Sequence, residues 1–486
     1  MDRKYLCAIA GVGLVLLFDP TSGASGRETT LSGSFSMQQE YDSNIYQEES
    51  DRQDQWTTIL LPALTLVSAS EKDTFSLAAS SDLSWDQRLD ERDFSHSLLL
   101  SADRELSERL RVTFSDSYSY NDNAPLRDMI VGDARLTLSR NFQRADDYEQ
   151  AEVARLLFPE LSYDPAMHYL LVLSEIERRY AQASPSVRLQ VDQYFSNTEG
   201  RRRHWDNELS IGAEYEYARD SIIGLGYRYF VNDDRTSGVE EYYEHSPYVS
   251  LSYRFNPQWL ASVNYEFNKG QHETSSDLTE NNTLFGLDYT LSQTDHLNAT
   301  YGYTTSNYQG DQEDLVEQIG SFGWNHDFTP QVRLTTSLDS SYLTREYYGD
   351  EREIGLDIGI SRLLQRGSIS VGAGTSMAES KQNSSWDDLR ESWNLDGSMT
   401  YAMREDLTGT INASYEKRDS WQEIVGKTTF DDYEAGVSLT YSFWRWFALT
   451  CRYTYSKLES SNDLIPDYDE HLIVVELTAA KELMRW

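Results

Sequence analysis

Apolar and polar residues alternate strictly along two neighbouring runs between residues 204 and 230. The apolar positions are Leu209, Ile211, Ala213, Tyr215 and Tyr217 in the first run, then Ile223, Leu225, Tyr227 and Tyr229 in the second. A period of two predicts strands with one apolar and one polar face, and Arg219-Asp220 between them predicts a tight hairpin. Gly, Ser and Glu fill the polar face, whereas Tyr is common on the apolar face. This combination is typical of a strand between lipid and a water-filled lumen.

The same pattern recurs along most of the chain. Alternating runs cover residues 30–41, 56–67, 74–85, 93–102 and 109–120, and from residue 243 the alternation continues almost unbroken to the end. Pro62 lies inside the second run, where proline is tolerated only at an edge or a bulge, so we expect a bend or the barrel seam nearby. We therefore predict an all-β fold, a single transmembrane antiparallel β-barrel of about 20–22 strands, since such barrels have even strand counts.

Residues 121–203 interrupt the strand pattern. Residues 145–158 and 165–183 predict two helices, the second with Asp164 as its N-cap and Pro165 at its first position. The flanks 134–138 and 187–191 alternate again. If both flanks are strands, the insert of residues 145–183 lies on the periplasmic side and the barrel has about 22 strands; if neither is, the insert lies outside and the count is about 20.

Short helices are marginal alone, so the apolar stripes of this insert need a surface to cover them. We interpret the insert as a plug of the lumen or a periplasmic gate. A self-packed surface decoration and a docking site for a partner are the alternatives.

The first residues predict a secretory signal peptide. Arg3 and Lys4 precede an apolar core of 14 residues, and Ser22-Gly23-Ala24 forms a small-residue cleavage site. An uncleaved anchor helix is the alternative, but the core is short for a span of about 20 residues. The chain thus divides into a signal peptide (1–24) and an outer-membrane β-barrel (25–486), which predicts a bacterial outer-membrane location.

Composition narrows the function. The chain carries 80 acids against 42 bases, a net charge of −38. Nucleic-acid binding needs basic patches, so we do not expect this protein to bind nucleic acid. A hydrophobic content of 39% is low for a helical membrane protein, but suits a barrel in which every second residue meets lipid. Once the signal peptide is removed Cys451 is the single cysteine, on an apolar face, which excludes an internal disulfide.

Alternation places a set of charged residues on the predicted lumen face. These candidate pore-lining residues are Glu208, Glu214, Glu216, Arg228, Arg254, Glu266, Asp288, Arg333, Asp339, Asp357, Asp396, Glu434 and Arg452. An arginine facing lipid at mid-membrane would cost about 2–4 kcal/mol, so such charges need a wet lumen. They either keep the wall hydrated and pair across strands, or form an acidic, hydroxyl-rich path for cations or a hydrated polymer.

Catalytic and metal-binding motifs are not found in the sequence. The eight histidines show neither metal-ligand spacing nor a catalytic triad order, and phosphate-loop, Rossmann and Cys-x-x-Cys patterns are absent. We expect no catalytic residue, cofactor or metal, and no enzyme activity. A hydrolase whose residues converge only in space stays open as an alternative. The acidic loops are expected to be solvated, with calcium or lipopolysaccharide-bridging cations as the other interpretation.

Several local motifs resemble a family of Gram-negative outer-membrane β-barrels associated with exopolysaccharide secretion systems. They are the exit Tyr41-Asp42-Ser43-Asn44, Pro62 in the second strand, and the turns Glu71-Lys72-Asp73 and Ser107-Glu108-Arg109. The resemblance covers about residues 30–120 and 204–486. Trp486 resembles the terminal aromatic residue that barrel-insertion machinery reads, although Glu482 stands where that signal has an apolar residue.

The resemblance implies passage of a secreted exopolysaccharide beside periplasmic polysaccharide-export proteins. It also implies contact with outer-membrane lipid, lipopolysaccharide and the barrel-insertion machinery. A general diffusion porin is the main alternative, followed by an outer-membrane enzyme or a surface scaffold.

Overall fold

The computed structural model of the chain shows a sheet of 20 strands. The structure describes residues 26–44, 54–87, 91–123, 202–234, 242–272, 277–309, 314–345, 349–382, 385–422, 426–461 and 467–486, together with Arg52, Val153, Leu157 and Arg179. The strands are β1 (Glu28–Asp42), β2 (Gln55–Ala69), β3 (Asp73–Asp86), β4 (Glu91–Ser107), β5 (Leu110–Asn123), β6 (Arg202–Ala218), β7 (Ser221–Asp234), β8 (Tyr242–Asn256), β9 (Trp259–His272), β10 (Leu278–Thr290), β11 (Asp295–Tyr308), β12 (Leu315–Thr329), β13 (Val332–Arg345), β14 (Gly349–Leu364), β15 (Gly367–Gln382), β16 (Ser385–Arg404), β17 (Leu407–Gln422), β18 (Gly426–Phe443), β19 (Phe447–Ser460) and β20 (Tyr468–Arg485).

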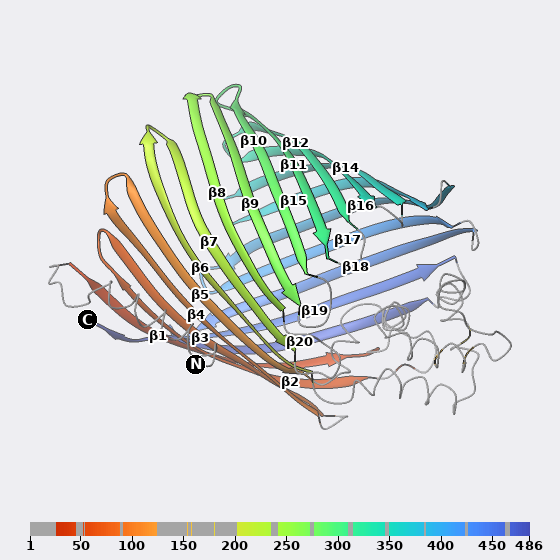
Figure 1. Cartoon of the computed structure of the whole chain (residues 1–486). Coiled ribbons are helices and arrows are strands. Elements are labelled where there is room, and N and C mark those ends of the chain that lie inside the picture. Colours follow the sequence, from red (N-terminus) through yellow and green to blue (C-terminus); the bar gives the residue numbers. More distant parts are fainter. Residues whose placement is uncertain are drawn as a thin grey trace.

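The sheet closes into a barrel. Each strand pairs antiparallel with the next one in the chain, and β1 pairs antiparallel with β20 (Figure 1). Closure satisfies the backbone hydrogen bonds of every strand without leaving an edge, as a lipid environment demands. The predicted all-β antiparallel barrel is confirmed, with 20 strands.

The two rims of the barrel differ in their connections. Each even-numbered strand from β2 to β18 is followed by a turn of two to four residues, and this rim also holds the start of β1 and the end of β20. We call it the turn rim. The longest connections, residues 43–54, 124–201, 235–241 and 461–467, all leave from the opposite rim, the loop rim. In outer-membrane barrels short turns face the periplasm and long loops the exterior, which orients this barrel.

The strand order also decides between the two arrangements of the insert. β5 and β6 pair directly, from Leu110 opposite Tyr215 to Asn123 opposite Arg202. Residues 124–201 therefore begin and end at the loop rim, which contradicts the periplasmic arrangement with about 22 strands and, with it, a periplasmic gate.

The predicted helices of the insert, 145–183, lie outside the described residues except Val153, Leu157 and Arg179, each of which is helical. A plug in the lumen stays a prediction. So does the signal peptide, since residues 1–24 lie outside the described residues as well. Within the described part of the chain no helix is long and apolar enough to cross a membrane.

The Tyr-Asp-Ser-Asn motif at the end of β1 forms hydrogen bonds to β20, where the barrel closes. Asn44 is fully buried; its backbone N–H donates to Asp42 Oδ1 (2.8 Å), and its side-chain amide donates to the carbonyl of Asp469 (3.0 Å). The Ser43 N–H donates to the carbonyl of His471 (3.1 Å), and the His471 N–H donates to Ser43 Oγ (2.8 Å). The motif thus ties the end of β1 to the start of β20, beyond simply ending a strand.

Two irregularities lie at this seam. β2 and β3 keep their register, but the ladder lacks the pairs at Leu61 and Pro62, because proline has no N–H to donate. The seam between β1 and β20 is one strand away, near where Pro62 predicted it. Near the end of β20 a bulge sets Ser32 opposite Glu482 but Leu31 opposite Met484. The bulge leaves Glu482 on the inner face and turns Met484 and Trp486 outward, which accounts for the departure at Glu482.

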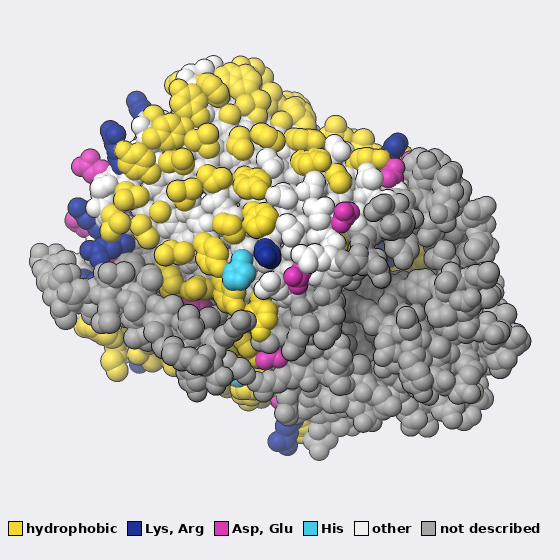
Figure 2. Space-filling model, in the orientation of Figure 1, with side chains coloured by type: hydrophobic (Ala, Val, Ile, Leu, Met, Phe, Trp, Pro, Cys, Tyr) yellow, Lys and Arg dark blue, Asp and Glu magenta, His cyan; other side chains and the backbone are white. Residues whose placement is uncertain are grey.

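The outer face is a continuous apolar belt. Leu225 is 59% exposed, Ile358 47% and Leu439 44%, all on the outward parity of their strands. Figure 2 shows hydrophobic side chains over the described outer face, with most charged side chains near its margins. Exposed apolar side chains on so large a surface indicate contact with lipid.

Candidate functional site

All 13 predicted pore-lining residues lie on the inner face of the barrel, opposite the apolar belt. The strand register fixes this: Arg228 stands opposite Ser210 and Ser246, and Asp357 opposite Ser337 and Gly374, all on the parity that excludes the belt residues. The structure therefore places these side chains in the lumen. Whether a solute passes along them stays a prediction.

Three of these residues come together at mid-height of the wall. Asp339 of β13, Asp357 of β14 and Asp396 of β16 line one shallow depression of about 360 Å³, which we call the acidic depression. Asn298 and Asn325 add amide groups to it. Within the described part of the chain, no three His, Cys, Asp or Glu side chains lie closely enough to hold a metal ion.

Glycine makes room for these carboxylates. A Cβ atom at Gly372 would overlap Asp396 Oδ1, and one at Gly374 would overlap Asp357 Oδ1 and the side-chain oxygen of Asn394. The acidic side chains thus lie flat along the wall, over the glycines of the neighbouring strand. This arrangement widens the lumen at the acidic depression and keeps the charges at the wall.

A second group surrounds Arg228 on β7. Its Nη2 lies 2.5 Å from Glu266 Oε1 and 3.8 Å from Glu244 Oε1. Glu244 also accepts hydrogen bonds from the hydroxyls of Tyr242 (2.5 Å) and Ser246 (2.7 Å). The Arg228 side chain is 35% exposed, so the Glu266 pair contributes about 0–1 kcal/mol and mainly fixes the direction of the guanidinium.

The remaining candidates lie apart from these two groups. Near the turn rim, Arg333 donates to Asp327 (2.7 Å) and Arg254 lies 3.5 Å from Asp220. Glu434 accepts a hydrogen bond from Asn412 at 3.4 Å. Five further candidates form no hydrogen bond or ion pair with another candidate among the described residues. They are Glu208, Glu214, Glu216, Asp288 and Arg452.

Paired hydroxyls cover much of the wall between the charges. Eight cross-strand Ser and Thr pairs on the inner face have oxygen–oxygen distances of 2.6–3.2 Å. The pairs are Ser36–Thr478, Ser76–Ser101, Ser80–Ser97, Thr300–Ser321, Ser370–Ser398, Ser376–Ser392, Thr400–Thr410 and Thr440–Thr450. A hydroxyl has one donor and two acceptor positions, so each pair keeps capacity to bind water or a sugar hydroxyl.

Sequence reasoning missed three buried apolar residues of the inner wall. Ile59 of β2, Leu458 of β19 and Val474 of β20 have inward parity, yet they are only 6%, 8% and 4% exposed. Water therefore does not reach the inner wall at these three positions. The signal was present in β2, which is apolar at both parities from Ile59 to Leu64.

Comparisons with known proteins agree with this architecture. A family model described as "Putative beta-barrel porin 2" matches residues 361–481. A search of curated proteins found no match.

Solved structures similar in fold include three iron-uptake proteins. The siderophore receptor PirA of Pseudomonas aeruginosa is 12% identical with a TM-score of 0.51, and the match covers 93% of this chain and 80% of that chain. The ferric enterobactin receptor PfeA mutant (R480A_Q482A) of the same organism is 9% identical with a TM-score of 0.52 and the same coverage. The FrpB iron transporter of Neisseria meningitidis (F3-3 variant) is 6% identical with a TM-score of 0.51, and covers 93% of this chain and 81% of that chain. The closed barrel, its apolar belt and these comparisons together make the chain an integral outer-membrane β-barrel of porin-like architecture.

Proposed function

We propose that the barrel is an outer-membrane channel through which a secreted exopolysaccharide passes, delivered by periplasmic polysaccharide-export proteins. The inner wall carries the proposal. Its paired hydroxyls, amides and carboxylates can exchange hydrogen bonds with a hydrated glycan, so the polymer need not lose its hydration at each step. The motifs around Tyr41 and Pro62 add a resemblance to barrels of such secretion systems.

The charge of the wall restricts the class of polymer. Among the 13 candidate lumen residues nine are acids and four are arginines. An acidic wall in a water-filled lumen attracts cations and repels anions. We therefore propose that the polymer is neutral or cationic rather than acidic. Export proteins on the periplasmic side would meet the turn rim.

The isolated barrel in a planar bilayer is expected to pass little current, because a polymer exit that stood open would leak small solutes. Single-channel recording checks this. The refolded protein should insert, judged by a shift of its electrophoretic band on boiling, and conduct only after the export partners are added. Steady large conductance without any partner would overturn the export proposal.

Steady conductance without any partner is what a general diffusion porin predicts. The porin family model over residues 361–481 favours this alternative. Under it, the acidic depression sets ion selectivity. The variant with Asp339→Asn, Asp357→Asn and Asp396→Asn should lose cation selectivity severalfold, measured as the reversal potential in a salt gradient. Glu391→Gln is the matched control, since Glu391 lies on β16, the strand of Asp396, but has outward parity. An unchanged reversal potential in the triple variant would contradict the role of the depression.

We also propose that the chain is not an enzyme. The support is the sequence, which has no catalytic motif. Glycan cleavage by the purified barrel, tested with polysaccharides of different charge, would overturn this proposal.

A further inference from the structure

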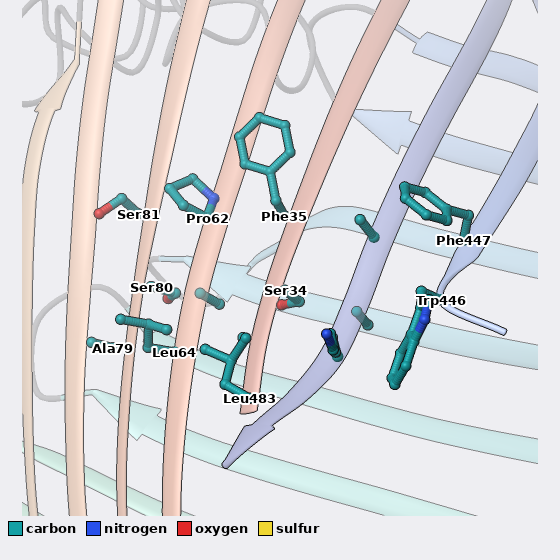
Figure 3. Close-up of a pocket in the computed structure, with 15 residues that line it drawn as sticks. Ser34, Phe35, Pro62, Leu64, Ala79, Ser80, Ser81, Trp446, Phe447 and Leu483 are labelled. Atoms are coloured by element: carbon teal, nitrogen blue, oxygen red, sulfur yellow. The ribbon is translucent and has the colours of Figure 1, made fainter. Parts of the chain in front are cut away.

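A groove of about 660 Å³ crosses the outer face of the barrel at its seam (Figure 3). Its lining comes from β1, β2, β3 and β20, from the turn between β18 and β19, and from the first residue of β19. Phe35, Leu64 and Leu483 stand along it, with Trp446 and Phe447 at one end and Pro62 farther along β2. Because Phe35 pairs with Ala479 and Leu64 with Ala79, all on the outward parity, the groove opens toward lipid.

Small residues form the floor of this groove. Gly33 of β1, Ala79 of β3 and Ala479 of β20 lie at outward positions, next to the larger exposed side chains of Leu64 and Phe35. Leu483, the extra residue of the β20 bulge, covers one end, since a Cβ atom on Gly33 would lie 3.1 Å from its Cδ1. The groove is therefore narrow and has small residues along its floor, a shape that suits an acyl chain.

Arg445 and Lys481 both lie over the indole ring of Trp446, at the turn-rim end of the groove. Lys481 Nζ lies 5.0 Å from the ring centroid of Trp446, and Arg445 Cζ lies 4.8 Å from it. The Ala480 N–H donates to the Trp446 carbonyl (2.9 Å), which holds the turn against β20. Trp444 and Arg445 have φ values of 46° and 47°, so the turn that presents Arg445 is left-handed.

These cations lack acidic partners among the described residues. Neither Arg445 nor Lys481 forms an ion pair with any described residue. Elsewhere on the described barrel arginines and lysines commonly pair with carboxylates, such as Arg404 with Asp406 and Lys427 with Asp419. In a chain with a net charge of −38, these two cations lie over one indole ring at the mouth of a lipid-facing groove, and neither is paired with a described carboxylate.

We propose that this groove is a specific binding site for one anionic phospholipid of the periplasmic leaflet. Its phosphate would lie between Arg445 and Lys481, and one acyl chain would run along Gly33, Ala79 and Ala479 toward Pro62. Basic side chains near a membrane surface each contribute about 1 kcal/mol toward an anionic headgroup. The turn rim faces the periplasm, so a glycerophospholipid of that leaflet meets both the charges and the groove.

Native mass spectrometry of the folded barrel in mild detergent, titrated with phosphatidylglycerol, tests the site. The wild-type barrel should keep one lipid at concentrations where further lipids are lost. The variant with Arg445→Gln and Lys481→Gln should bind this lipid about 30-fold more weakly, at about fivefold for each cation removed. Ala479→Leu, which fills the floor and leaves both cations, should also weaken it. The band shift on boiling confirms that each variant is folded.

Matched controls separate this site from ordinary surrounding lipid. Arg366→Gln removes a cation from the β14–β15 turn on the same rim, and Ala373→Leu enlarges an outward alanine of β15; both should retain the lipid. Equal losses in test and control variants, or none in either, would overturn the proposal. So would equal retention of diacylglycerol, which has no phosphate, or tighter retention of lipopolysaccharide than of phosphatidylglycerol.

Discussion

Leu225→Arg and Ile358→Arg are each expected to prevent stable insertion of the barrel into the outer membrane. Both side chains lie on the lipid-facing belt, 59% and 47% exposed. An arginine on the lipid face costs about 2–4 kcal/mol at mid-membrane and less near the interfaces. That cost is a large fraction of the stability of an ordinary folded domain. The measurement is the yield of boiling-sensitive protein in isolated outer membranes.

Ser252→Arg is the matched control. Ser252 lies on β8, opposite Ile222 and Ser262 on the inner face, so an arginine there would extend into the lumen. Its insertion should stay near the wild-type yield. If all three variants inserted equally well, the assignment of inner and outer faces would be wrong.

Gly367→Ala is expected to destabilise the barrel by about 1–3 kcal/mol, the usual cost of forcing extra volume into a packed site. A Cβ atom at Gly367 would lie 2.9 Å from the carbonyl carbon of Thr400 and from Tyr401 Cα, and still closer to the Thr400 oxygen. These are backbone atoms of β16, so no side-chain rotation can relieve the overlap. The β15–β16 pairing must shift at the turn rim, and the temperature at which the band shift is lost should fall.

Gly355→Ala on the neighbouring strand β14 provides the comparison. A Cβ atom there would approach the Thr375 carbonyl oxygen at 3.7 Å, an ordinary contact distance. This variant should stay within about 0.5 kcal/mol of wild type, as do most substitutions without a specific clash. Equal melting of both variants would show that the two strand pairs are more flexible than their spacing indicates.

The sequence predicts the strands well where lipid faces one side of the wall. Around Leu225 the alternation of apolar and polar residues gives both the hairpin and the face of every residue. Some strands were predicted too short: the sequence predicts a strand over residues 93–102, whereas β4 spans Glu91–Ser107. Beyond the membrane both faces of a strand meet water, so the alternation disappears while the hydrogen bonding continues.

The contacts within the lumen were harder to predict. Parity alone places Asp339, Asp357 and Asp396 on the inner face, but their meeting in one depression depends on the register of β13 to β16. Strand tilt and turn geometry set that register. The bulge opposite Leu31 was equally hidden, because one extra residue reverses the faces of all that follow.

The closure between β1 and β20 governs when the barrel can assemble. β1 pairs with β20 through residues 30–42 and 472–485, and Thr29 exchanges backbone hydrogen bonds with Trp486. During synthesis β1 emerges long before its second partner, so it presents an unpaired edge that can pair with another chain. Contacts so distant in sequence form slowly. A chain cut short before residue 472 would keep two open edges, and quality-control proteases should remove it rather than allow it to insert.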